Sequence, residues 1–229
     1  MKTKLLICCE MIRKEMTAIL KDIPYEGDII WMEKGLHEHP ENLRAALQEE
    51  IGKWDGCYET ILLGYGMCGN GVCGLKAEQS QLIIPKFDDC IRFLLSREER
   101  APILSDPRTL YYTDGWMDMG DSLLSPKSKY FEQYGEKKGF KIIKMMLANY
   151  KSVTFLETGY YDMTACEEEV RPMADRLGLE VKRTPACLRM LQKLLTGPYD
   201  DEFVSLAPGE TLAMTHFDDR ARCLFPERD

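Results

Sequence analysis

Five glycines and two cysteines fall within the eleven residues 64–74. Glycine lets a backbone take positive φ and approach a neighbour or a ligand closely. Thiols hold soft metal ions and carry out sulfur chemistry. The segment therefore predicts either a metal site or a loop that binds a cofactor. Its cysteines are Cys68 and Cys73, and the glycines that we expect to line a bound cofactor are Gly64, Gly66, Gly69 and Gly71.

The glycine spacing also suggests a nucleotide site. Gly64-x-Gly66-x-x-Gly69 follows a predicted strand with the spacing of a dinucleotide-binding turn. The turn follows the third predicted strand rather than the first, it contains no basic residue, and Cys68 would crowd a pyrophosphate. These features favour the thiol chemistry over the nucleotide.

Further metal-ligand residue types stand at the ends of other predicted strands. Because the carboxyl ends of parallel strands share one sheet edge, we expect these side chains to gather there. Three thiols and one imidazole suit zinc or an iron–sulfur cluster, and the sequence leaves these two alternatives open. Cys73 also remains an alternative ligand. The expected ligands are Cys9, His37, Cys68 and Cys90, beside predicted strands 4–9, 28–32, 60–64 and 81–85.

A role in packing alone is the competing interpretation. A cysteine at a strand end commonly serves as a small buried hydrophobe. The chain has no Cys-x-x-Cys pair, and a loop histidine such as His37 is commonly solvated. Under this interpretation the protein is a non-enzymatic module that binds a small ligand or a partner.

The elements that must position these residues alternate between strands and amphipathic helices. This alternation predicts an α/β fold with mainly parallel sheets flanked by helices. We expect a single unit, 1–229, in which a break near residues 101–107 permits two Rossmann-like lobes, 1–105 with the metal site and 106–229 closing over it. The expected contacts from the second lobe are Asp114, Trp116, Tyr161 and Asp162.

Composition narrows the class of protein. The net charge is −8 and no basic face is evident, which argues against nucleic acid as a partner. No apolar run approaches the roughly 18 residues of a membrane span. The apolar start, residues 5–9, is too short for a signal peptide, so we expect a cytoplasmic protein. In that compartment the nine cysteines are expected to be thiols or metal ligands rather than disulfides.

Several of these segments resemble the DUF1638 family, a domain of unknown function common in methanogenic archaea and anaerobic bacteria. The resemblance extends over nearly the whole chain. It rests on 7–10, 35–40, 63–71, 84–90, 111–116 and 203–209.

The resemblance implies a function as well as a family. The family pattern has Cys, His, Cys and Cys where Cys9, His37, Cys68 and Cys90 stand. Members are associated with corrinoid-dependent metabolism of methylamines and betaines. This implies a methyltransferase or its accessory protein, with a corrinoid protein or a small methylated substrate as partner. The alternative is an iron–sulfur redox protein that reactivates a corrinoid, and the resemblance does not decide between an enzyme and an accessory protein.

Overall fold

The computed structural model describes residues 2–95, 108–117 and 122–217, which form two compact units. The first unit contains the described residues of 1–13, 19–93 and 190–229, and the second those of 14–18 and 94–189. The chain therefore returns to the first unit at Met190. This division differs from the lobes 1–105 and 106–229 expected from the sequence, because the last strand, at residues 203–206, pairs with the sheet of the first unit.

The first unit is built on a five-stranded sheet with the order β2-β1-β3-β4-β8. The strands β2, β1, β3 and β4 are parallel to one another, whereas β8 runs antiparallel to β4. The strands are β1 (Lys2–Cys9), β2 (Gly27–Met32), β3 (Tyr58–Gly64), β4 (Gln81–Pro85) and β8 (Phe203–Leu206).

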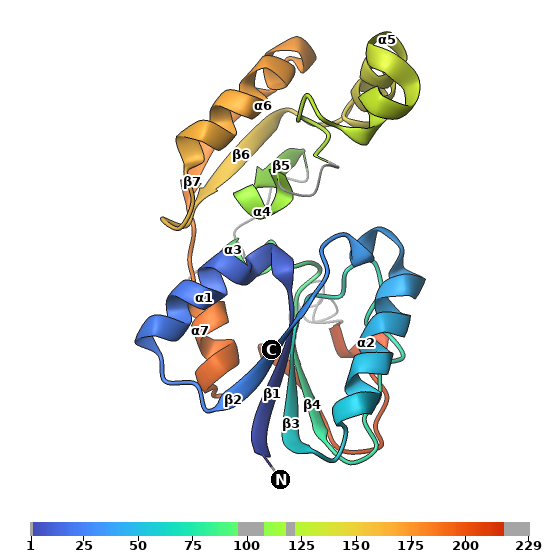
Figure 1. Cartoon of the computed structure of the whole chain (residues 1–229), viewed down its shortest axis with the longest axis vertical. Helices are drawn as coiled ribbons and strands as arrows, with labels where there is room; N and C mark the ends of the chain where they lie inside the picture. The colour runs from blue at the N-terminus through green and yellow to red at the C-terminus, as the bar shows by residue number, and fades with distance from the viewer. Residues whose placement is uncertain (1, 96–107, 118–121, 218–229) are drawn as a thin grey trace, which may run out of the picture. The chain divides into compact units, whose positions relative to one another are not determined.

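The centre of this sheet is a continuous apolar run rather than an alternating one. Residues 5–9 of β1 and 61–64 of β3 are all buried, as expected for parallel strands covered on both faces. Helices α1 and α7 lie on one side of the sheet and α2 on the other (Figure 1). The helical elements that lie wholly or partly in this unit are η1 (Glu10–Ile12), α1 (Arg13–Asp22), η2 (Leu36–Glu38), α2 (Pro40–Trp54), α3 (Arg92–Leu95), α7 (Arg189–Thr196) and η3 (Met214–Phe217).

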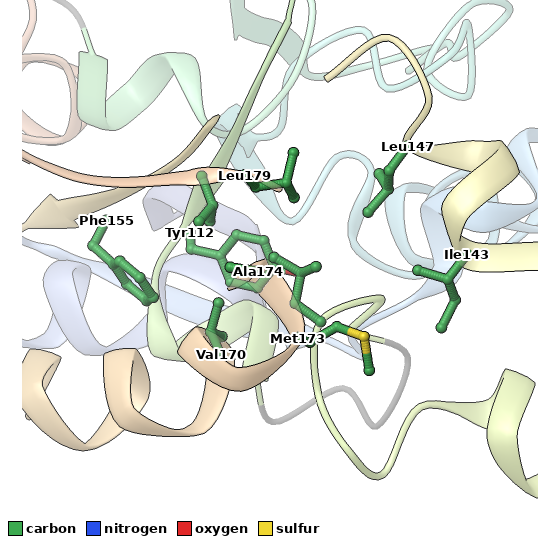
Figure 2. Close-up of a cluster of buried hydrophobic side chains, with 10 residues drawn as sticks. Tyr112, Ile143, Leu147, Phe155, Val170, Met173, Ala174 and Leu179 are labelled. Atoms are coloured by element: carbon green, nitrogen blue, oxygen red, sulfur yellow. The ribbon is translucent and has the colours of Figure 1, made fainter. Parts of the chain in front are cut away.

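The second unit has a three-stranded parallel sheet with the order β5-β6-β7. Side chains from its strands and helices form one core, in which Tyr112 and Phe155 pack beside Val170 and Met173 (Figure 2). Its elements are β5 (Thr109–Tyr112), α4 (Asp114–Met117), α5 (Lys129–Met146), β6 (Ser152–Glu157), α6 (Met163–Leu177) and β7 (Glu180–Pro185).

The expected α/β fold with mainly parallel sheets is confirmed. Of the eight strands in the described residues, seven have a parallel neighbour. In the described ranges, no helix combines the length and apolarity needed to cross a membrane.

The contact between β1 and β3 requires glycine at the end of β3. Gly64 lies opposite Cys8 in the strand register, and the Cys8 thiol donates to the Gly64 carbonyl at 3.9 Å. A Cβ on Gly64 would lie 2.4 Å from the Cys8 sulfur, well inside the van der Waals distance. The two strands approach this closely only because position 64 has no side chain.

We predict that Gly64→Ala lowers the free energy of unfolding by about 1–3 kcal/mol, because the added methyl group overpacks a buried contact. Gly52→Ala is the matched control, since a Cβ at this position in α2 meets nothing within 4 Å. Replacing a helical glycine should raise stability by about 0.5–1 kcal/mol. Urea unfolding measures the change in the free energy of unfolding for each variant. Equal changes for the two substitutions would contradict the close approach of β1 and β3 at Gly64.

Candidate functional site

The predicted ligand residues lie at or after the carboxyl ends of four strands. Cys9 is the last residue of β1, and Cys68 and Cys90 lie in the segments that follow β3 and β4. His37 lies in η2, after β2. Because β1 to β4 are parallel, these segments all leave the sheet at the same edge.

The segments after β3 and β4 are joined by backbone hydrogen bonds. The Met67 N–H donates to the Phe87 carbonyl at 2.7 Å, and the Cys68 N–H donates to the Asp88 carbonyl at 2.9 Å. Gly66 permits this approach, because a Cβ there would lie 2.7 Å from the Asp89 backbone. The pairing holds Cys68 beside the segment that carries Cys90.

Cys68 begins a left-handed turn. The φ angles of Cys68, Gly69 and Asn70 are 46°, 62° and 70°. For residues other than glycine this conformation costs roughly 1–2 kcal/mol each, although asparagine tolerates it better than most. The turn is held by the Gly71 N–H, which donates to the Cys68 carbonyl at 3.1 Å, and by Arg44, which donates to the Asn70 carbonyl at 3.0 Å.

Three of the four predicted ligands, Cys9, Cys68 and Cys90, interact electrostatically, since one thiolate raises the pKa of another. Burial and then the neighbouring Cys9 raise the pKa of Cys68 to about 12. Burial raises the pKa of Cys90 well above its ordinary value, with further contributions from Cys68 and Cys9. We call these three residues the thiol cluster.

The thiol cluster also acts electrostatically on Tyr65. Burial and then the Cys9, Cys8, Cys68 and Cys90 thiols raise the pKa of Tyr65. Burial also raises the pKa of Cys9, whereas the Met11 backbone N–H and the Tyr65 hydroxyl lower it. Without a cation, these groups therefore favour their neutral forms.

His37 and Cys73 do not share this arrangement. Neither residue is among the main groups that perturb the pKa of Cys9, Cys68 or Cys90. The charged neighbour of Cys73 is Arg44, which lowers its pKa against the effect of burial. In residues 2–95, 108–117 and 122–217, no three His, Cys, Asp or Glu side chains are arranged as ligands of one metal ion. The four-ligand metal site therefore stays a prediction.

The loop glycines have structural roles of their own. Gly64 makes room for Cys8, Gly66 for the Asp89 backbone, and Gly71 for Leu43, whose Cδ2 would lie 2.7 Å from an added Cβ. Gly69 supplies a positive φ in the turn. These packing and conformational demands account for glycine at all four positions, and cofactor binding by them stays a prediction.

The residues expected to close the site all belong to the second unit. Asp114 is buried and forms an ion pair with Lys14, and Trp116 packs against the core of the unit. The Tyr161 hydroxyl donates to the Leu156 carbonyl at 2.7 Å. Asp162 caps α6 by accepting from the Ala165 N–H at 3.1 Å. Their expected role in closing the site stays a prediction.

Comparison with known proteins places the chain in a family. A family model described as "Protein of unknown function (DUF1638)" matches residues 31–195, which is more than half of the chain. The chain belongs to the DUF1638 family. No curated protein and no solved structure matches it. The matched range includes His37, Cys68 and Cys90, whereas Cys9 precedes it.

Sequence reasoning missed Tyr65 as a residue of the site in this DUF1638 protein. Tyr65 directly follows β3 and is only 2% exposed. By geometry, its hydroxyl has no hydrogen-bond partner within the part of the chain that the structure describes. The available signal was an aromatic residue with a hydroxyl between two glycines of the cysteine-bearing loop, where a buried polar group needs an acceptor.

We predict that burial protects Cys9 and Cys90 of the reduced, metal-free DUF1638 protein from iodoacetamide at neutral pH. The thiolate is the nucleophile, and burial raises the pKa of both thiols. Cys57 is exposed and should react at least about tenfold faster. Peptide mass spectrometry over time gives the rates, and the urea-unfolded protein is the control, in which the difference should disappear. Equal rates in the folded protein would contradict the buried cluster.

Proposed function

We propose that this protein binds a soft or borderline metal ion through the thiols of Cys9, Cys68 and Cys90. The observation that supports this proposal is that three thiols at or after the carboxyl ends of three parallel strands interact, since Cys9 raises the pKa of Cys68, and both raise the pKa of Cys90. Thiolate ligands select zinc and iron–sulfur clusters over hard cations. His37, half-buried in η2, is the fourth ligand that the sequence predicts.

The electrostatics of the thiol cluster agree with the proposal. Neighbouring thiolates repel one another, and part of the pKa increase of Cys68 and Cys90 comes from this repulsion. A divalent cation reverses the effect, because it stabilises several thiolates at once and releases their protons to solvent. Since no complete ligand set is arranged for a metal in the described residues, binding requires these side chains to change rotamer.

The reaction that we propose follows from the family resemblance alone. It is methyl transfer in corrinoid-linked one-carbon metabolism in the cytoplasm, by this protein as the methyltransferase or as an accessory protein. Bound zinc would lower the pKa of a coordinated thiol and so provide a thiolate nucleophile. The corrinoid would come from a partner protein.

We predict that anaerobically purified protein contains about one zinc ion or one iron–sulfur cluster per chain, and that Cys68→Ser loses most of it. Cys73→Ser is the matched control, because Cys73 lies on the same loop outside the thiol cluster. Elemental analysis gives the stoichiometry. An absorption spectrum separates colourless zinc from a brown iron–sulfur cluster.

Two outcomes would contradict this proposal. Wild-type protein without stoichiometric metal, before and after incubation with zinc, would favour a binding module whose cysteines are merely packed. Loss of metal from Cys73→Ser but not from Cys68→Ser would show a different ligand set.

A further inference from the structure

The second half of α5 concentrates positive charge in a protein that is acidic as a whole. The segment 137–151 has five lysines and no aspartate or glutamate, whereas the net charge of the chain is −8. Four of these lysines lie within α5, and all four are exposed. They are Lys137, Lys138, Lys141 and Lys144.

Helical spacing places these lysines on one side of α5. Lys137 and Lys141 are four residues apart, and Lys141 and Lys144 are three apart, so their side chains are neighbours. Met145 follows Lys141 by four residues and is 77% exposed. Ile143, on the opposite side of the helix, belongs to the buried core of the second unit (Figure 2). We call the exposed side the lysine face; it consists of Lys137, Lys138, Lys141, Lys144 and Met145.

No carboxylate compensates the charge of the lysine face. Exposed lysines of other elements have acidic partners, as Lys182 has in Glu180 at 2.9 Å. The four lysines of the face form no ion pair within the part of the chain that the structure describes. Glu136, which directly precedes the face, pairs instead with Arg176 of α6 at 3.4 Å. The face therefore presents unpaired positive charge.

Helix stability does not explain this arrangement. Like charges three or four residues apart repel one another and destabilise a helix. The helix dipole favours a cation only near the last turn, where Lys144 lies. Lys137, Lys138 and Lys141 gain nothing from it. A negatively charged surface outside the protein would remove the repulsion.

The composition of the face indicates what carries that negative surface. Protein interfaces combine an apolar centre, in which methionine is enriched, with charged residues at the rim that steer the partner. Met145 with lysines beside it has this composition. A membrane fits less well, because the apolar side of α5 is buried in the core and is not available to enter lipid. Nucleic acid fits less well too, because residues 129–151 contain no arginine, the side chain that binds phosphate in a bidentate manner.

We propose that the lysine face docks an acidic surface of a partner protein, with Met145 in the contact and the lysines around it. The inference is independent of the proposed metal binding, since it uses no residue of the thiol cluster.

The test uses two acidic polypeptides as probes of the full-length protein, poly-L-glutamate and a random copolymer of glutamate and tyrosine. We expect both to bind, and the copolymer to bind more tightly, because a tyrosine ring adds apolar contact area for Met145. Both affinities should fall about 10-fold or more between about 50 mM and about 500 mM salt, because salt screens exposed charges.

Two triple substitutions of lysine by glutamine change the net charge equally. The first removes charge from the lysine face and should lower the affinity for both probes about 10-fold or more at low salt. Its Tm should be unchanged or higher, because repulsion within the helix is removed. It combines Lys137→Gln, Lys141→Gln and Lys144→Gln.

The matched control removes three exposed lysines that already have acidic partners, and its affinity should stay within about twofold of wild type. It combines Lys53→Gln, Lys76→Gln and Lys182→Gln. Met145→Ser should bind poly-L-glutamate as wild type does and lose the preference for the copolymer.

Several results would overturn the inference. Equal weakening by the two triple variants would show a general effect of net charge. Tighter binding of phosphatidylglycerol vesicles or of duplex DNA than of the copolymer would make the face a membrane or nucleic-acid surface. Self-association at low salt that the first triple variant abolishes would make a second copy of the chain the occupant. Metal content should be the same in all variants, so a failure of the metal proposal is seen separately.

Discussion

Backbone pairing between the segments after β3 and β4 is the constraint on which the candidate site depends. The Met67 and Cys68 N–H groups donate to the Phe87 and Asp88 carbonyls. These bonds bring two separate loops together at the carboxyl edge of the sheet. They form only because Gly66 leaves no side chain between its backbone and that of Asp89. This pairing extends the contact between β3 and β4 and holds Cys68 beside the segment that carries Cys90.

The same constraint explains the strained turn. A loop that must first pair with its neighbour and then turn back toward α2 has little freedom after Met67. It turns through three successive left-handed residues, of which only Gly69 is a glycine. Strain of this kind persists when the surrounding contacts over-determine the backbone, and it is common at functional sites. Here it falls on Cys68, the least buried thiol of the cluster.

Burial and charge both act against thiolates in the metal-free thiol cluster. Burial and the neighbouring thiols raise the pKa values of Cys68 and Cys90, so these groups favour their neutral forms. A bound cation would stabilise several thiolates at once and release their protons to solvent. The cysteines at or after the ends of three parallel strands are therefore the feature on which the proposed metal binding rests.

The sequence by itself determined the elements and the edge at which they end. Apolar runs predict strands at 4–9, 28–32, 60–64 and 81–85, and the structure has a strand at each. Parallel topology then places Cys9, Cys68 and Cys90 at one edge, because the carboxyl ends of parallel strands coincide. Only the tertiary structure decided that Met190 returns the chain to the first unit, that β8 is antiparallel, and that Cys68 pairs with the segment after β4. These features depend on pairing and packing between residues far apart in the chain, and local periodicity carries no information about such contacts.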